Sequence, residues 1–349
     1  MRSSLPGREL VLLPSSSPRT HVTATSDDVN VFTRFWRNLA VQDVFILAYF
    51  IILAVAVGFG SGPGRHECLQ VLAIDIGALL LGLFLTRSEI IPVGAFWNSF
   101  LYRVSLWIPI FLSYFQLREI LPAVTMRALD AEILAFDMRV FGYEPSLAWD
   151  KYVTPATTEW FSFFYFGYFF VLVANIFPMM LAAKNMRRLS HFSLGLMIVF
   201  CCGHLGYLVV PGYGPYHYLR GQFQHELEGG FFWALVKASV EAGGAMKDIF
   251  PSLHTGVPTY FTLFAFWHRK SFPFRYLWPV LLFCITQIIG ATMFLRWHYL
   301  IDIFAGLTLA TTAVIVSAKV TGWEHDRRLA RGVAPTFRPL EYRWPREGT

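Results

Sequence analysis

Eight long apolar runs constrain this chain more than any other feature of its sequence. Each run is close to the roughly 20 residues that a helix needs to cross the hydrocarbon core of a bilayer. The runs are predicted at residues 41–57, 68–85, 96–117, 158–183, 192–210, 252–267, 274–295 and 298–320. The sequence therefore predicts an all-α polytopic membrane protein with about eight transmembrane helices.

The composition agrees with a membrane protein and argues against a large soluble core. Hydrophobic residues make up 55% of the 349 residues, and charged residues make up only 15%. Both fractions lie outside the usual range of soluble domains. Aromatic residues reach 17%, as lipid-facing helices with aromatic belts require. The four cysteines form no CxxC pair, so neither a disulfide framework nor a zinc ribbon is predicted.

The basic residues gather between the apolar runs and in the tails. The formal net charge is +6, which in a soluble protein would suggest nucleic acid as a partner. Here the basic segments at 184–188, 268–270 and 327–346 follow the positive-inside pattern, which places them and both termini in the cytoplasm. The runs at 252–267 and 298–320 then begin at the opposite face. We expect membrane lipids as partners and no nucleic acid.

The apolar runs also divide the chain into segments. Residues 1–38 are mostly polar and lack the apolar stretch of a signal peptide, so they are predicted to be a disordered cytoplasmic tail. Residues 39–95 are predicted to form two accessory transmembrane helices, and residues 96–320 a catalytic membrane domain with a six-helix core. Within that domain, residues 121–150 are too charged to span and predict an amphipathic helix on the outer interface. Residues 321–349 are predicted to be a basic cytoplasmic tail.

His298 and Asp302 stand where the last apolar run begins. They are four residues apart, so on a helix both side chains share one face. An aspartate that accepts a hydrogen bond from one ring nitrogen fixes the tautomer and leaves the other nitrogen free to act as a nucleophile. The same spacing also fits a capped helix start with a structural histidine.

His254 lies in the passage Pro-Ser-Leu-His-Thr-Gly, at the start of another apolar run. Ser252 is placed to cap the amino terminus of that helix, whose first turn offers free N–H groups to a phosphate. His254 is then placed to donate a proton to a leaving oxygen. The structural alternative is an interfacial histidine beside a cap. Because His254 and His298 both lie at the outer ends of their runs, we expect them to converge.

These passages resemble the type 2 phosphatidic acid phosphatase superfamily. The resemblance rests on Pro-Ser-Leu-His followed later by His-Tyr-x-x-Asp, which opens the last membrane helix. Within the superfamily, the chain resembles the branch of inositol phosphorylceramide synthases and their bacterial relatives, which has Pro-Ser-Leu-His where phosphatases have Pro-Ser-Gly-His. The passages 207–215 and 129–142 are also similar to that branch.

The resemblance implies a metal-independent, cofactor-free phosphotransferase or phosphatase that acts on a lipid phosphate. His298 would attack phosphorus and form a phosphohistidine, Asp302 would orient it, and His254 would protonate the leaving alcohol and then activate the acceptor. The Ser-Arg pair of the phosphatase pattern is replaced here by Ala291 and Thr292, which favours the synthase-like branch.

Several further residues are candidates for substrate binding. Arg296 is placed either to supply the missing positive charge or to anchor the chain at the interface, and Lys247 is either a second phosphate ligand or a solvated loop charge. Tyr213 and Tyr216 could line the entrance for a headgroup, or serve only as interfacial aromatics. His204, inside the fifth run, fits a hydrogen bond between helices better than a ligand.

Three alternatives to a phosphotransferase stay open. The first is a simple lipid phosphatase with water as the acceptor. The second is a metal-dependent membrane hydrolase with His254, His298 and Asp302 as ligands, although the sequence lacks an HExxH motif. The third is a transporter or scaffold, against which the absence of a visible repeat argues. The family branch predicts a bacterial inner membrane, with the active site on the periplasmic or lumenal face.

Overall fold

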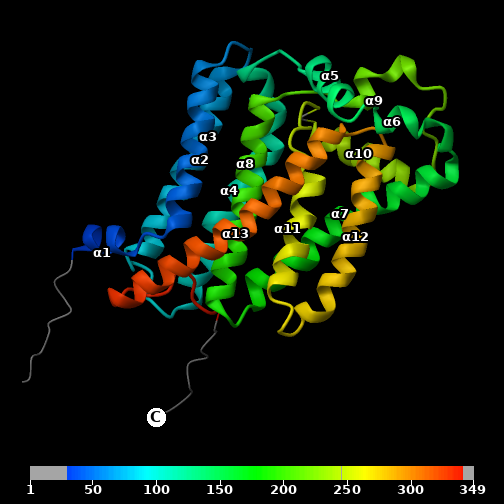
Figure 1. Ribbon diagram of the computed structural model, residues 1–349. Helices are drawn as coiled ribbons and strands as arrows, with labels where there is room; N and C mark the ends of the chain where they lie inside the picture. Colours follow the sequence, from blue (N-terminus) through cyan, green and yellow to red (C-terminus); the bar gives the residue numbers. More distant parts are fainter. Residues whose placement is uncertain (1–29, 245, 341–349) are drawn as a thin grey trace, which may run out of the picture. The chain divides into compact units, whose positions relative to one another are not determined.

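The computed structural model describes residues 30–244 and 246–340, and the regular elements within these ranges are all helices. The predicted all-α membrane fold is therefore confirmed. Helices long and apolar enough to cross a membrane are α2 (Val41–Phe59), α3 (Arg65–Arg87), α4 (Phe96–Val124), α7 (Pro155–Ala182), α8 (Met186–Val209), α12 (Phe274–Phe294) and α13 (Leu300–Ala330). These seven helices correspond to seven of the eight predicted runs, and Figure 1 shows how they are arranged.

The remaining predicted run, at 252–267, forms helix α11 (Leu253–Trp267), which is shorter than the others. Its 15 residues rise only about 22 Å, less than the hydrocarbon thickness of about 30 Å. Helix α11 packs against α7, α8, α12 and α13, and most of its side chains are buried. It is therefore a central helix surrounded by protein, and the polar groups at its start face other helices instead of lipid.

The remaining helices are short and do not span. They are α1 (Val31–Asn38), α5 (Asp130–Val140), α6 (Pro145–Ala148), η1 (Asp150–Tyr152), α9 (Pro215–Tyr218), η2 (Arg220–Gln222) and α10 (Phe231–Gly243). Helices α5, α6, α9 and α10 gather at the end of the bundle where α11 and α13 begin (Figure 1). They form a cap of loops and short helices over the starts of these two helices.

The predicted interfacial helix at 121–150 is divided differently in the structure. Residues up to Val124 belong to α4, and α5 covers only Asp130–Val140. Gly142 ends this stretch in a left-handed conformation, with φ of +79°, which glycine adopts without steric cost. The buried residues of α5 include Asp130 and Asp137, so its polar face packs against protein.

Both predicted tails contain ordered structure in their described parts. Helix α1 occupies the end of the predicted 1–38 tail, whose residues 1–29 lie outside the described residues. Helix α13 continues to Ala330, past the predicted boundary at 320. Phe337, beyond that helix, is fully buried, and residues 341–349 again lie outside the described residues.

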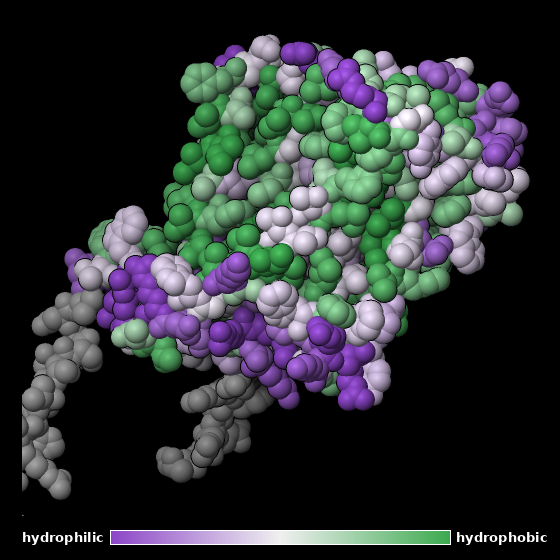
Figure 2. Space-filling view, in the orientation of Figure 1, coloured by the Kyte–Doolittle hydropathy of each residue, from purple (hydrophilic) through white to green (hydrophobic). Residues whose placement is uncertain are grey.

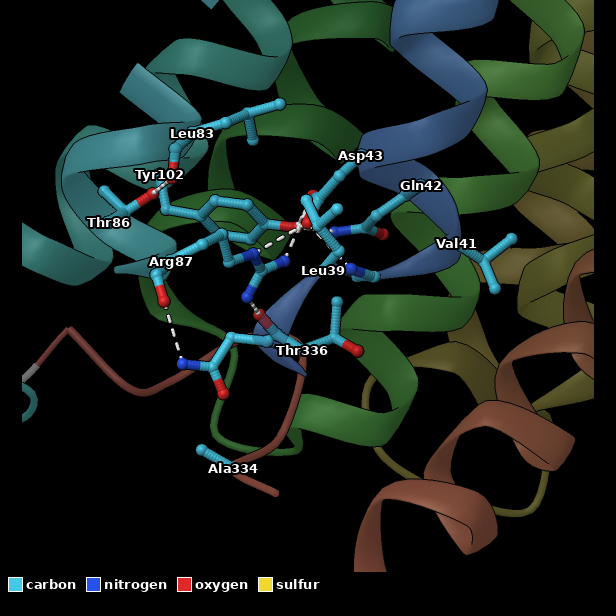
Figure 3. A network of polar contacts seen from close by, with 12 residues as sticks. Leu39, Val41, Gln42, Asp43, Leu83, Thr86, Arg87, Tyr102, Ala334 and Thr336 are labelled. Carbon is cyan, nitrogen blue, oxygen red and sulfur yellow. Dashed lines mark hydrogen bonds and ion pairs between the residues drawn. The ribbon is translucent and has the colours of Figure 1, made fainter. Parts of the chain in front are cut away.

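A buried polar network joins the first helices to the carboxyl-terminal segment (Figure 3). The Arg87 side chain of α3 pairs with Asp43 of α2 at 2.7 Å, and the hydroxyl of Tyr102 in α4 donates to the same carboxylate at 2.6 Å. Arg87 also donates to the carbonyl oxygen of Thr336 at 3.1 Å. Because each charged group is paired, the network can be buried, and it fixes the ends of α2, α3 and α4 together.

The distribution of side chains on the surface agrees with a membrane environment. Large hydrophobic side chains are exposed along the long helices, including Ile51, Phe115 and Phe170, which are 48%, 55% and 67% exposed. Figure 2 shows hydrophobic residues over the middle of the helices and hydrophilic residues gathered near α1 and the end of α13. Apolar exposure on this scale is expected where lipid tails replace water.

Helices α11 and α13 approach each other closely at Gly306. A Cβ atom on Gly306 would lie 2.5 Å from the backbone oxygen of Ser252 and 3.3 Å from the backbone nitrogen of Gly256. The two helices can therefore approach this closely only because residue 306 has no side chain. This contact sets the distance between the beginnings of the two helices.

Replacing Gly306 with alanine is therefore expected to destabilise the protein by about 1–3 kcal/mol, because backbone atoms must move. Gly77→Ala is the matched control, since a Cβ atom there meets nothing within 4 Å and alanine favours the helix. Thermal unfolding in detergent micelles measures both. A Gly306→Ala variant as stable as the wild type would contradict the close approach.

Candidate active site

Two carboxylates hold the amino terminus of α13. Asp302 accepts a hydrogen bond from the backbone N–H of Tyr299 at 2.9 Å. Asp137, from α5, accepts hydrogen bonds from the N–H groups of Leu300 and Ile301 at 2.7 and 3.1 Å. These N–H groups have no partner within the helix, so the carboxylates satisfy them. His298, two residues before the helix, is therefore held in a defined position.

His298 and Asp302 meet as their spacing suggests. The Nδ1 atom of His298 lies 3.4 Å from Oδ2 of Asp302, and both side chains are buried. This distance is long for a hydrogen bond, but catalytic hydrogen bonds commonly tighten when substrate binds. The arrangement leaves the Nε2 face of the imidazole as the side that can react.

His254 lies opposite, at the start of α11. The Ser252 side chain accepts a hydrogen bond from the N–H of Thr255 at 3.3 Å, as expected for an amino-terminal cap, and the N–H of Ser252 donates to the carbonyl oxygen of Asp302 at 3.0 Å. The His254 ring packs on Tyr165 and Tyr168, with 4.3 Å between ring centroids in each case. These contacts fix His254 relative to α13.

The two histidines converge. Their ring centroids are 6.3 Å apart, so one tetrahedral phosphate group can contact both rings. Only His298 has a carboxylate beside it, while the Nε2 atom of His254 is buried without a hydrogen-bond partner. The pair is therefore asymmetric, with one oriented ring and one ring whose nitrogen is available for a substrate proton.

Both rings line a cavity of about 410 Å³, within the range of small-molecule sites. Its walls are mostly aromatic and come from α4, α7, α8 and α10, with Asp248 as an acidic lining residue. Among the described residues that line it, none is lysine or arginine. The cavity therefore suits an apolar molecule with few charges.

Arg296, a candidate for the missing positive charge, is engaged elsewhere. Its guanidinium donates to Asp150 at 2.8 Å and to the carbonyl oxygen of His225 at 2.6 Å. It also lies 3.7 Å from the ring centre of Phe223. Arg296 does not line the cavity, and its contacts join Asp150 to the loop that contains Phe223 and His225.

The Arg296→Met variant is therefore expected to lose about 3 kcal/mol of stability, because Asp150 would keep a buried charge without its main cationic partner. Combining it with Asp150→Asn should recover part of the loss, as coupled residues do. Thermal unfolding of the single and double variants measures this, with the exposed Arg220→Met as control. An unchanged melting temperature with lost donor binding would instead favour a phosphate ligand.

The other predicted binding residues are divided between the cavity and the loops around it. The Lys247 ammonium donates to the carbonyl oxygens of Met126 and Arg127 at 2.9 and 3.2 Å. Tyr213 lines the cavity. Tyr216 stacks on Trp297 with 4.7 Å between ring centroids and does not line the cavity. Of these residues, only Tyr213 is placed to touch a molecule inside the cavity.

Sequence reasoning assigned no role at the site to Asp130, Asp137 and Asp248. Asp130 accepts hydrogen bonds from the N–H groups of Tyr213 and Gly214, and from the Tyr299 hydroxyl. Asp130 and Asp137 are seven residues apart, so they share one face of α5 with the buried Ile133. That periodicity was the available signal, since acidic residues on the apolar face of a helix need partners.

Metal ligation was one of the alternatives that the sequence left open. Within residues 30–244 and 246–340, no group of three or more His, Cys, Asp or Glu side chains is arranged to hold a metal ion. His254, His298 and Asp302 lie together, but Asp302 faces the far side of the His298 ring through Nδ1. The geometry is that of one imidazole oriented by a carboxylate beside a second imidazole.

A family model described as the PAP2 superfamily matches residues 131–316, which is more than half of the 349 residues. The chain belongs to the PAP2 superfamily. The matched segment includes Asp137, His254, His298 and Asp302. Comparisons with curated proteins and with solved structures found no match.

Membership in the PAP2 superfamily confirms the broad prediction made from the sequence. Members are generally phosphatases and phosphotransferases, and the long apolar helices make this chain an integral, multi-pass membrane protein. The chain is therefore a membrane enzyme of this general kind.

Proposed function

We propose that the chain is a lipid phosphotransferase that works through a phosphohistidine on His298, and that its activity resembles that of inositol phosphorylceramide synthases. The observation that carries this proposal is the pair of histidine rings, 6.3 Å apart, with Asp302 beside only one of them. This asymmetry supports a division of roles between the two histidines. His298 is the nucleophile, and His254 is the general acid and base.

The reaction is a double displacement at phosphorus. In the first half, Nε2 of His298 attacks phosphorus, the bond to the leaving lipid oxygen breaks, and His254 donates a proton to that oxygen. In the second half, the acceptor hydroxyl gives a proton to His254 and its oxygen attacks phosphorus, which breaks the N–P bond. Free N–H groups in the first turn of α11, next to the Ser252 cap, stabilise the charge on the phosphate.

The charges around the cavity favour a phosphodiester donor. A phosphomonoester carries a charge of about −1.5 to −2 near neutral pH. A phosphodiester has one fewer ionisable oxygen, so it carries a single negative charge. The described lining residues include Asp248 but no lysine or arginine, and the side chains of Arg296 and Lys247 are held by other groups. A monoanionic diester therefore meets less repulsion here, which supports the synthase-like branch over a simple phosphatase.

The topology we propose follows the basic segments. They lie on the cytoplasmic side, so the starts of α11 and α13 face the periplasm or a lumen, with a bacterial inner membrane as the proposed location. Residues 96–320 form the catalytic domain and residues 39–95 an accessory pair of helices. Tyr213 lines the cavity and is 38% exposed, which supports its proposed role at the entrance for a headgroup.

The test uses purified protein in lipid micelles with phosphorus-labelled phospholipids, EDTA, and diacylglycerol, ceramide and inositol as acceptors. We expect label to move to an acceptor in the presence of EDTA. Release of free phosphate or of a free phosphorylated headgroup would mean that water is the acceptor and that the chain is a phosphatase. Loss of all turnover on adding EDTA would favour a metal-dependent hydrolase.

The pH dependence provides a second test. Burial lowers the pKa of His298 from 6.5 to about 4, and the nearby charge of Asp248 only partly opposes this shift. Protonation of His298 would remove the nucleophile, so the acid limb of kcat/KM that belongs to His298 should lie near pH 4. Burial also lowers the pKa of His254, to about 3, so the anionic phosphate of the bound donor must raise that pKa before His254 can donate a proton. A pH profile of labelled transfer measures this. An acid limb near 6.5 would contradict a buried, neutral His298.

A further inference from the structure

His204 of α8 is a buried histidine that the proposed mechanism does not use. Its side chain is 0% exposed. The Nδ1 atom lies 2.9 Å from the hydroxyl of Tyr49 in α2, and that hydroxyl lies 2.9 Å from Oγ of Ser113 in α4. The ring is therefore held from behind by helices α2 and α4. This contact is the interhelical hydrogen bond expected from the sequence.

The other ring nitrogen of His204 has no such partner. Its Nε2 atom is buried and makes no hydrogen bond, and His204 lines the same cavity as His254 and His298. The ring neighbours of His204 include Tyr114 and Phe200, each with a centroid distance of 6.1 Å. An unpaired polar atom in an aromatic wall is unfavourable unless a ligand supplies its partner.

The surroundings of Nε2 indicate which chemical group fits. Ser113 already donates its proton to the carbonyl oxygen of Ile110 at 2.8 Å, so the single proton of Tyr49 goes either to Ser113 or to His204. Nε2 is an acceptor in the first case and a donor in the second. A hydroxyl group satisfies both tautomers, because it donates and accepts. An anionic group would be repelled by Asp248, because the described lining residues include no lysine or arginine.

The position of His204 separates this hydroxyl from the one that reacts. The His254 ring packs on Tyr165 and Tyr168, whereas His204 lies among Tyr49, Tyr114, Phe200 and Tyr207. The two imidazoles are thus on different parts of the cavity wall. A lipid whose reacting hydroxyl lies at His254 can reach His204 with a second hydroxyl group.

We propose that the aromatic cavity binds the acceptor, a neutral lipid alcohol, and that Nε2 of His204 binds a second hydroxyl of that lipid. This inference rests on the proposed phosphotransferase function and names the acceptor class of the same site. His204 determines specificity, while His254 removes the proton from the reacting hydroxyl. The accessory helix α2 then contributes to selectivity, because Tyr49 orients the His204 ring.

The test measures binding without any donor lipid, so it does not depend on turnover. The full-length protein in detergent micelles is titrated with long-chain diols of increasing separation between the hydroxyl groups, and with the matched primary alcohol, at equal mole fractions. At one separation, we expect the diol to bind about tenfold more tightly than the alcohol, the size of one buried hydrogen bond. In the His204→Leu variant the ratio of the diol affinity to the alcohol affinity should fall to about one, while the affinity for the alcohol stays unchanged.

Tyr49→Phe is the second variant, because it keeps the aromatic ring and removes only the hydroxyl that holds Nδ1. It should reduce the diol advantage without abolishing binding. Equal binding of all diols and the alcohol, or an advantage that persists in His204→Leu, would overturn the inference.

A labelled donor added afterwards separates the two proposals. Transfer of label preferentially to the diol supports both the phosphotransferase function and the role of His204. Equal transfer to the diol and the alcohol supports the phosphotransferase function and overturns the role of His204. If the diol binds more tightly than the alcohol but no acceptor becomes labelled, the proposed phosphotransferase function is wrong. The proposal that the cavity binds an acceptor is then wrong as well.

Discussion

The His298→Ala variant is expected to lose about 10⁴-fold or more in kcat for transfer of labelled phosphate to an acceptor. The variant lacks the nucleophile, and His254 cannot replace it because no carboxylate orients its ring. Losses of this size are typical when the nucleophile of a double displacement is removed. The measurement is initial rate at saturating donor in micelles, with purified variant and wild type side by side.

The control for His298→Ala is His66→Ala, which removes an exposed histidine on α3 and should leave the rate unchanged. Thermal unfolding of both variants shows whether the fold is kept. A folded His298→Ala variant with full activity would end the proposal that His298 carries the phosphoryl group.

The Asp302→Asn variant is expected to be slowed by about 10²–10³-fold without being inactive. Asparagine keeps an oxygen that can accept the hydrogen bond from the N–H of Tyr299, which Asp302 accepts at 2.9 Å. It removes the negative charge that stabilises the His298 ring as the ring bonds to phosphorus. The loss should lie in kcat, because Asp302 acts on the nucleophile and does not bind the lipid.

Asp326→Asn is the matched control for Asp302→Asn, since it makes the same change at an exposed position of the same helix. Its rate should equal that of the wild type. If Asp302→Asn retained full activity, the orienting role of Asp302 would be wrong. If Asp302→Asn unfolded at a much lower temperature, its loss of activity would reflect the capping of α13 instead.

Most of the fold was predictable because membrane helices are recognised by length and hydrophobicity alone. Helices α2, α3, α7 and α12 each lie within a few residues of their predicted runs. Helix α11 also lies within one residue of its predicted run at 252–267, although its 15 residues are fewer than a full span needs. The largest error in length is at α13, which extends beyond the predicted run because Glu324 and Arg328, buried and paired at 3.1 Å, can be accommodated inside protein.

The candidate site was predictable in its central residues and less so in those that support them. The spacing of four residues predicted that His298 and Asp302 would meet on one helix face; they do meet, but His298 precedes α13 and reaches Asp302 from the segment before the helix. Arg296, only two residues before His298, gave no sign in the sequence that Asp150 would hold it. Likewise, the hydrogen bonds of Asp137 to the start of α13 join residues that are 163 and 164 positions apart. Such contacts depend on the tertiary arrangement, which local spacing does not specify.

The most direct test of the account is to trap the covalent intermediate. Purified protein is mixed with phosphorus-labelled donor lipid in the absence of acceptor, quenched with base and digested. We expect an acid-labile, base-stable label on the peptide that contains His298, and no label in His298→Ala. Turnover of the donor with no labelled protein, or a label on a different residue, would contradict transfer through His298.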